Sequence, residues 1–245
     1  MRTTYVLKAL GSIDAKSVRR DSLLRWMGLI PILIALLLRW GVPSLAVWLS
    51  RQFQFDLVPY YPLLMSFVLL AVPMMYGSVI GFLLLDQRDD HTLTALQVTP
   101  LTLNGYLAYR ITIPMLLSVV MSVIIFPVAG LVEIRFLPLL IAALAASLLA
   151  PGYALLLAAF AKNKVQGFAL MKAAGILGWP PVMAYFVQSG WQLAFGIVPT
   201  YWPAKLFWVL EAGEANAWVY LLVGVVYQSL LVAILLRRFN RVMLQ

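Results

Sequence analysis

The polar residues with the widest chemical range lie together in one stretch of this sequence, residues 85–110, which reads LDQRDDHTLTALQVTPLTLNGYLAYR. The stretch combines aspartates, arginines and the single histidine of the chain. Because the sequence has no cysteine, no second histidine and no H-E-x-x-H pattern, it offers no recognisable nucleophile–base pair or metal-ligand set. We therefore expect no catalytic and no metal-binding residues, and we interpret the charges as groups that bind another protein.

A short amphipathic helix is predicted inside this stretch, over residues 92–98, because Leu93, Leu96 and Val98 are apolar and Pro100 ends the pattern. Carboxylates just before its first turn are favoured by the helix dipole. A helix that is apolar on one face and acidic at its start suits docking into a groove of a partner protein. The plainer alternative is a solvated loop with a helix cap. The residues expected to dock are Asp86, Arg88, Asp89, Asp90, His91, Thr92, Leu93 and Leu96.

The elements that hold this stretch must span a membrane, because 63% of the 245 residues are hydrophobic and only 11% are charged. A soluble protein is about half apolar and a quarter charged. The apolar residues form long unbroken runs, such as 137–161 and 217–236, whereas a membrane barrel would show short alternating strands. Since the backbone of a spanning helix satisfies its own polar groups inside lipid, we predict a single all-α membrane domain over residues 1–245.

Six spans are predicted, since about 20 apolar residues cross the hydrocarbon core of a bilayer. They cover residues 23–38 (or as far as 49), 60–85, 105–132, 136–161, 167–187 and 217–236. Residues 1–22 carry an apolar stripe on a basic background, which predicts an amphipathic interfacial helix, with a solvated tail as the alternative. Residues 86–104 form the loop between spans two and three. Residues 188–216, rich in Trp and Tyr and broken by prolines, are predicted as a re-entrant segment at the outer surface.

The basic residues orient these spans. Fourteen of the eighteen Lys and Arg fall on the side of the two termini, and four fall on the opposite side. Cytoplasmic loops are enriched in Lys and Arg, so both termini are expected in the cytoplasm. The same pattern accounts for the net charge of +9, and no nucleic-acid partner is expected. The four basic residues on the outside are Arg39, Arg51, Arg135 and Lys205.

Three segments carry a resemblance to a known family. The loop between spans two and three contains an acid followed by Thr-Leu-x-x-Leu and Thr-Pro-Leu, formed by Asp86, Thr92, Leu93, Leu96, Thr99, Pro100 and Leu101. Residues 198–208 (VPTYWPAKLFW) precede the last span, and Arg20-Asp21 precedes the first. In these features the chain resembles the type-two ABC exporter permease family, and within it the small permeases of the drug or fluoroquinolone exporter kind. His91 departs from the family pattern, which usually has glycine at that position.

The resemblance implies a transport subunit of an ATP-hydrolysing complex in the cytoplasmic membrane of a bacterium or archaeon. Two permease subunits, identical or different, would each dock a coupling helix, here about residues 89–98, onto one of two ATPase subunits. Leu93 and Leu96 would be the buried anchors. This chain has no G-x-x-x-x-G-K-[ST] loop, so it is expected to bind no cofactor, with ATP and Mg held by the separate ATPase. The substrate moved outward would be hydrophobic or amphipathic, of the drug, lipid or glycolipid class.

The resemblance also places the transport path along spans one, two and five. Methionine and aromatic side chains make an adaptable apolar wall, although packing between helices or contact with lipid is the plainer reading of each residue. Arg39 either reaches the outer interface beside Trp40 or faces a cavity. The path residues expected are Arg39, Met74, Met75, Tyr76, Trp179, Tyr185 and Phe186.

Three other classes of protein are alternatives to a transport subunit of an ATP-hydrolysing complex. An ion-coupled secondary transporter keeps carboxylates at mid-membrane depth, whereas all nine Asp and Glu of this chain fall in predicted loops or termini. An intramembrane enzyme would need paired aspartates or a histidine–metal motif within the spans. A non-transporting membrane protein, such as an assembly or immunity factor, is compatible with the sequence.

Overall fold

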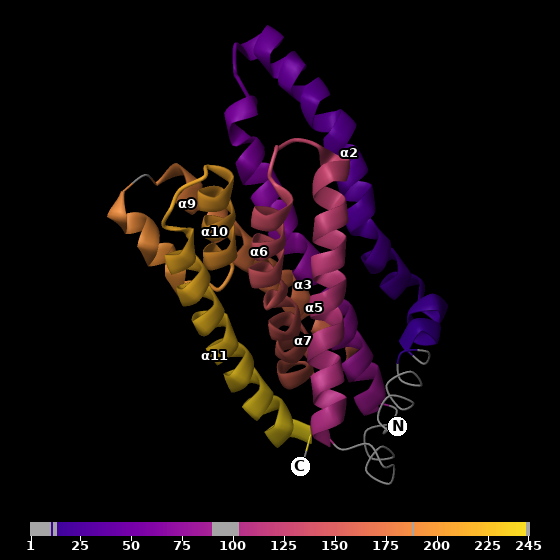
Figure 1. The fold of residues 1–245 in the computed structure, drawn as a ribbon. Helices are drawn as coiled ribbons and strands as arrows, with labels where there is room; N and C mark the ends of the chain where they lie inside the picture. Colours follow the sequence, from indigo (N-terminus) through magenta and orange to yellow (C-terminus); the bar gives the residue numbers. More distant parts are fainter. Residues whose placement is uncertain (1–10, 12–13, 90–102, 188, 244–245) are drawn as a thin grey trace.

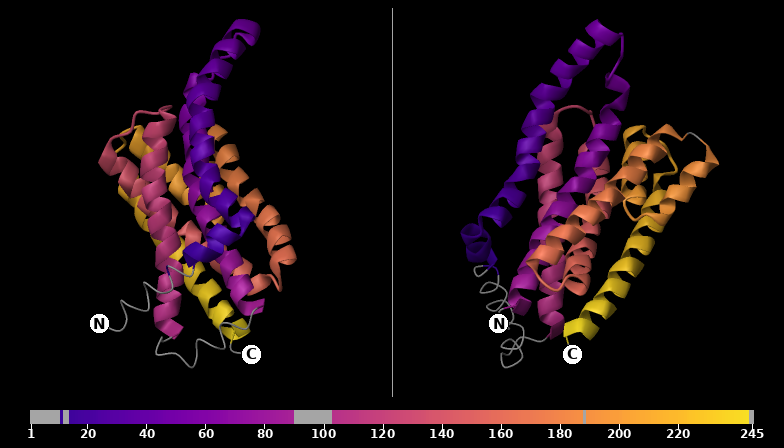
Figure 2. Two further views of the ribbon diagram at one scale, coloured as in Figure 1. Left: turned by 90° about the vertical axis from the view of Figure 1, so that its right-hand side faces the viewer. Right: turned by 180° about the vertical axis from the view of Figure 1, so that it is seen from behind.

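The computed structural model of this chain describes residues 11, 14–89, 103–187 and 189–243. Every regular element in these ranges is a helix, and none of the described residues forms a strand (Figures 1 and 2). The all-α prediction is therefore confirmed. The described part of the predicted interfacial helix, residues 14–20, is helical and leads into the first long helix.

Within the described ranges, five stretches are long and apolar enough to cross a membrane. Four of them match predicted spans one, two, three and six, and the fourth predicted span consists of two short helices separated by Leu148 alone. The elements are α2 (Ser22–Phe53), α3 (Tyr61–Asp89), α5 (Leu103–Ala129), α6 (Phe136–Ser147) with α7 (Leu149–Phe160), and α11 (Ala217–Met243).

The fifth predicted span is a broken helix. It consists of α8 (Lys164–Gly175), the 3₁₀ turn η2 (Ile176–Gly178) and α9 (Trp179–Phe186). The break lies just before Pro180 and Pro181, where two consecutive backbone N–H groups are missing and the first ring crowds the preceding turn. The connection to α11 contains η3 (Gly190–Ile197) and α10 (Tyr201–Glu211), while η1 (Val58–Tyr60) joins α2 to α3.

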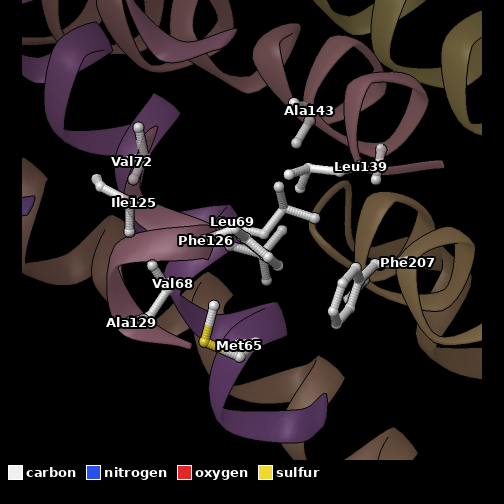
Figure 3. Packing of buried hydrophobic residues seen from close by; sticks show 14 of the residues in the cluster. Met65, Val68, Leu69, Val72, Ile125, Phe126, Ala129, Leu139, Ala143 and Phe207 are labelled. Carbon is white, nitrogen blue, oxygen red and sulfur yellow. The ribbon is translucent and has the colours of Figure 1, made fainter. Parts of the chain in front are cut away.

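Helix α3 lies at the centre of the bundle and contacts α2, α5, α6, α7, α8 and α10. Its buried face meets α5, α6 and α10 in one core cluster, shown in Figure 3. Toward α7 it carries Gly77 and Gly81, which allow the two backbones to approach closely: a Cβ added at Gly81 would lie 2.9 Å from the Leu157 side chain. Close approach through small residues is the main way in which helices associate inside a bilayer.

The bundle has two ends that differ in charge. The basic end carries residues 14–25, 84–89, 103–110, 158–164 and 236–243, with many exposed Lys and Arg. The distal end carries residues 50–60, 129–136 and 186–217. Figure 1 shows that the start of α2 and the end of α11 lie toward the basic end, and that the hairpin of α2 and α3 extends past the other helices at the distal end.

We predict that Gly77→Ala destabilises the protein, because the new methyl group would overlap the backbone carbonyl of Ala150 and lie 2.9 Å from the Tyr153 Cβ. Overpacking of this kind costs about 1–3 kcal/mol. Thermal unfolding of the purified protein in detergent measures the loss. Gly152→Ala is the matched control, because a Cβ there meets nothing within 4 Å. Equal melting temperatures for the two variants would contradict the close α3–α7 packing.

Candidate functional site

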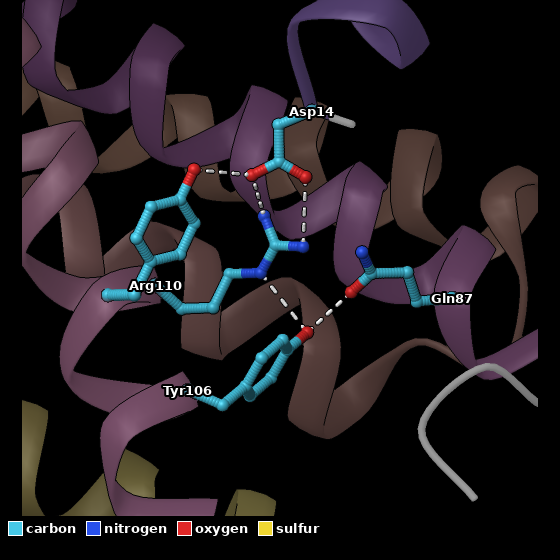
Figure 4. Close-up of polar contacts among 5 residues, drawn as sticks. Asp14, Gln87, Tyr106 and Arg110 are labelled. Atoms are coloured by element: carbon cyan, nitrogen blue, oxygen red, sulfur yellow. Dashed lines mark hydrogen bonds and ion pairs between the residues drawn. The ribbon is translucent and has the colours of Figure 1, made fainter. Parts of the chain in front are cut away.

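Buried polar side chains at the basic end join the N-terminal helix to α5. The Arg110 guanidinium makes a two-pronged ion pair with Asp14, with Nη1 2.7 Å from Oδ2 and Nη2 3.1 Å from Oδ1 (Figure 4). The Tyr109 hydroxyl donates to the same carboxylate at 3.0 Å. Only 3% of Arg110 and 8% of Asp14 is exposed, so the two charges satisfy each other away from water. A forked guanidinium–carboxylate pair fixes orientation as well as distance.

The same guanidinium connects α5 to the end of α3. Arg110 Nε donates to the Tyr106 hydroxyl at 3.1 Å, and that hydroxyl in turn donates to Gln87 Oε1 (Figure 4). Because Gln87 Oε1 can only accept, the phenol is the donor of this bond. Since α3 ends at Asp89 and α5 begins at Leu103, this bond ties together the two helices that flank residues 90–102.

A second set of contacts lies beside the first. Lys164 Nζ, at the start of α8, pairs with Asp21 at 2.7 Å and with Asp86 of α3 at 2.9 Å. Burial alone would lower the pKa of Lys164, but the two carboxylates raise it overall, so its ammonium stays charged. Arg88 of α3 donates to the Ala161 carbonyl at 2.8 Å, just after the end of α7. A cation at that position satisfies carbonyls that the helix leaves free. We call both sets together the polar clamp: Asp14, Asp21, Asp86, Gln87, Arg88, Tyr106, Tyr109, Arg110 and Lys164.

Local sequence explains why these side chains meet. Tyr106, Tyr109 and Arg110 are three and four residues apart, so they share one face of α5. Asp21 directly precedes α2, and its Oδ1 accepts the Leu24 N–H at 3.4 Å, so it caps that helix as well as pairing with Lys164. Asn163 caps α8 by accepting the Gln166 N–H at 3.0 Å. Both helix starts are thereby held by local hydrogen bonds as well as by the ion pairs across the bundle.

The clamp is suited to positioning helices and not to catalysis. Its oxygens and nitrogens are engaged with one another, and no three His, Asp or Glu side chains in the described part of the chain gather where they could hold a metal ion. The clamp connects four segments at the basic end: the N-terminal helix, the end of α3, the start of α5 and the α7–α8 turn.

The predicted docking residues divide into two groups. Asp86 and Arg88 make their described contacts within the chain, to Lys164 and to the Ala158 and Ala161 carbonyls. Asp89 is the last residue of α3. The remaining positions, together with the side chain of Asp89, lie outside the described residues: Asp90, His91, Thr92, Leu93 and Leu96.

An apolar groove lies between α2 and α3 and holds one of the predicted path residues. A pocket of about 150 Å³ opens between α2 and α3, and its lining is entirely apolar. Met75 lines this pocket together with Pro31, Ile34, Leu38, Leu64, Phe67, Val68, Ala71 and Val72. Phe67 also approaches η2, since a Cβ at Gly178 would lie 3.6 Å from its ring. The groove is therefore lined by predicted spans one and two, and predicted span five lies beside it at Phe67.

The other predicted path residues are spread over the bundle. Met74 and Tyr76 pack against the core cluster, and the Tyr76 hydroxyl donates to the Gly28 carbonyl at 3.2 Å. Trp179 and Phe186 are largely exposed on α9. Tyr185, between them in space and in α9, donates to the Pro59 carbonyl at 2.9 Å at the distal end. The structure thus brings Tyr185 and Phe186 together but does not gather all seven residues at one place.

Arg39 of α2 lies level with the end of α5. Its Nη1 donates to the Val128 carbonyl at 3.0 Å, in the last turn of α5. The guanidinium therefore satisfies a free carbonyl at a helix C-terminus, where a positive charge is favoured. Residues 40–53 of α2 continue past this point for about 21 Å. Arg39 does not line the pocket between α2 and α3.

Sequence reasoning missed most of the polar clamp. The sequence patterns gave no individual role to four of its residues: Asp14, Tyr106, Arg110 and Lys164. The spacing of Tyr106, Tyr109 and Arg110 on one helical face was the available signal that α5 begins with a polar surface. Nothing in the sequence pointed to Asp14 as its partner, because 95 residues lie between Asp14 and Arg110.

We predict that Arg110→Met strongly destabilises the protein, because it leaves the Asp14 carboxylate buried without its countercharge. Breaking one partner of a buried ion pair costs about 3–5 kcal/mol. The double variant Asp14→Asn/Arg110→Met should unfold at a higher temperature than Arg110→Met alone. Lys16→Met, an exposed change in the same N-terminal helix, is the control. If Arg110→Met melts like Lys16→Met, the ion pair does not hold the two segments together.

The chain matches known proteins over nearly its whole length. The family model for the fluoroquinolones export permease protein Rv2686c-like family matches residues 14–236. Two proteins of Mycobacterium tuberculosis, the fluoroquinolones export permease proteins MT2760 (strain CDC 1551 / Oshkosh) and Rv2686c (strain ATCC 25618 / H37Rv), are each 38% identical over 241 residues. Each match covers 96% of this chain and 94% of the relative. No solved structure matches the chain significantly. The matched region runs from Asp14 of the polar clamp to Leu236 in α11, and the chain belongs to the Rv2686c-like family of fluoroquinolones export permease proteins.

Proposed function

We propose that this chain is the membrane permease of an ATP-driven exporter whose ATPase is a separate protein that docks on the segment between α3 and α5. The observation that supports this most is the polar clamp at the base of that segment. The Tyr106–Gln87 bond joins the helices on either side of residues 90–102. The Asp14–Arg110 pair then joins them to the N-terminal helix. A loop that only connected two spans would not need this buried polar network.

The proposed mechanism is a shift between two packings of the bundle. Nucleotide drives such a shift only if the two states bind it with different affinity. ATP and Mg, held on the partner ATPase, would supply this difference by closing the ATPase subunits on each other. The docked segment would then move, and the clamp would transmit the movement to α3, α5 and, through Lys164, to the broken helix α8–α9. Because that helix lies beside the groove along α3, its displacement would change the shape of the groove.

We propose six spans with the basic end in the cytoplasm. Residues 164–186, taken through α8, η2 and α9, would reach about 34 Å if fully extended as a helix, which is enough to cross the hydrocarbon core. The exposed Lys and Arg of the basic end agree with cytoplasmic enrichment of basic residues. The groove is open on one side in the single chain, and a second permease subunit, identical or different, would close it.

The substrate is proposed to be a drug-like amphipathic molecule. The relatives are named for the export of fluoroquinolones. The pocket beside Met75 is small and has an apolar lining, so it would accept an aromatic or aliphatic part of a molecule and leave polar groups outside. Methionine adapts its shape to different ligands. A fluoroquinolone is therefore the first substrate to test.

We predict that Leu93→Asp abolishes both co-purification of the cognate ATPase and ATP-dependent fluoroquinolone uptake into inverted membrane vesicles, because the charge would fall on the apolar docking face. Leu193→Asp is the control, since Leu193 is exposed at the distal end of the protein. The control should retain both properties. ATPase binding and uptake that survive in Leu93→Asp would overturn the proposed docking segment.

A further inference from the structure

A cluster of aromatic side chains lies at the distal end of the groove and has no part in the proposed docking or in the clamp. It is built from three separate segments: the loop before α3, the end of α9, and α10. Its members are Phe55, Tyr60, Tyr185, Phe186 and Trp208. We call these residues the distal aromatic cluster.

Tyr60 is the hub of this cluster. Its ring stacks on Phe55 with 5.6 Å between centroids and 10° between planes. The Phe186 ring lies 5.8 Å away and the Tyr185 ring 6.5 Å away. Tyr185 then meets Trp208 edge-to-face at 5.1 Å. These separations lie in the range in which aromatic rings attract one another.

The cluster has one exposed side and one buried side. Phe186 is 60% exposed and Phe55 is 42% exposed, whereas Trp208 is only 8% exposed. The buried Trp208 and the Tyr185–Pro59 hydrogen bond hold the cluster in place. The exposed rings are therefore a supported surface, with their faces available to a ligand. The cluster also continues the groove, because Leu64 and Phe67 of the pocket follow Tyr60 by one and two helical turns.

A carboxylate lies near one member of the cluster, Tyr185. Glu211 follows Trp208 by three residues at the end of α10, so the two share a helix face. It lies close enough to the Tyr185 hydroxyl to interact with it electrostatically, and partial burial raises the pKa of the Glu211 carboxyl. No Lys or Arg among the described residues forms an ion pair with it. Lys205 of the same helix has its ammonium over the Tyr220 ring, 5.5 Å from the centroid.

We propose that the distal aromatic cluster and Glu211 form a binding site for a planar aromatic cation. A cation is attracted to the faces of aromatic rings, and more strongly when a carboxylate stands nearby. A flat ring system can stack on the exposed rings of Phe55 and Phe186. An anionic ligand would be repelled by Glu211. This inference rests on the proposed export function. A site at the distal end of the groove would bind the substrate as it leaves the transporter.

The alternative is that the aromatic residues only pack the loop before α3 against α9 and α10. In that case changes to the rings would alter stability, and Glu211 would have no effect on any ligand. Binding and stability must therefore be measured on the same variants.

The test uses the full-length protein in lipid nanodiscs without ATPase, with ethidium as the probe and empty nanodiscs as the blank. Phenanthridine, which has the same ring system and is uncharged at neutral pH, serves as a competing ligand. We predict saturable ethidium binding, weakened roughly tenfold by Glu211→Gln, which removes one charged contact. Phe186→Leu should weaken binding of both molecules about threefold or more, because a ring face is lost. Glu211→Gln should leave the inhibition constant of phenanthridine, the uncharged competitor, unchanged.

Matched controls lie at the same end of the molecule. Glu214→Gln removes an exposed carboxylate three residues after Glu211, and Phe136→Leu removes an exposed ring outside the cluster; both should bind ethidium like the unaltered protein. The proposal is overturned if ethidium does not bind saturably, if Glu211→Gln binds it as Glu214→Gln does, or if binding falls only where the melting temperature also falls. Since this assay needs no ATPase, ethidium binding without ATP-driven transport would leave the site standing and overturn the export function instead.

Discussion

The buried ion pair between Asp14 and Arg110 is the constraint on which the basic end of this protein depends. Either charge alone would be costly away from water, so the N-terminal helix and α5 must meet in one geometry for both to be satisfied. The two prongs of the guanidinium and the Tyr109 hydroxyl leave little freedom in that geometry. Because Arg110 also binds Tyr106, which reaches Gln87, the constraint extends to α3.

The rest of the bundle is arranged around α3, which links the two ends of the molecule. At the basic end α3 enters the polar clamp through Asp86, Gln87 and Arg88. In the middle it packs closely on α7 through Gly77 and Gly81, which makes this pair of helices difficult to separate. Toward the distal end its other face borders the apolar groove. The broken helix α8–α9 lies beside this groove and is the more deformable element, since its backbone hydrogen bonding is interrupted near Pro180 and Pro181.

Composition and apolar runs were enough to predict an all-α membrane protein and the positions of most long helices, because lipid exposure forces those patterns. Pro180 and Pro181 are the sequence signal for the break in the fifth predicted span. A hydropathy pattern does not reveal it, because hydropathy does not depend on backbone hydrogen bonds. The polar clamp could not be predicted, since Asp14 and Arg110 each resemble an ordinary flanking charge and only the fold brings them together. The distal aromatic cluster was not predicted: the sequence pattern named Tyr185 and Phe186 only as path residues. Phe55, Tyr60 and Trp208 come from segments whose pairing depends on tertiary packing.

The proposed function requires the polar clamp to make the segments around residues 90–102 move together as one rigid unit. The sequence has no cysteine, so spin labels can be placed on Arg20 and Lys162, two exposed sites on the N-terminal helix and the α7–α8 turn. Electron–electron distance measurements on the permease–ATPase complex should give one unchanged distribution with and without nucleotide for this pair. A second pair, Arg20 with Glu214 at the distal end, should change. A nucleotide-dependent shift between Arg20 and Lys162 would contradict the account.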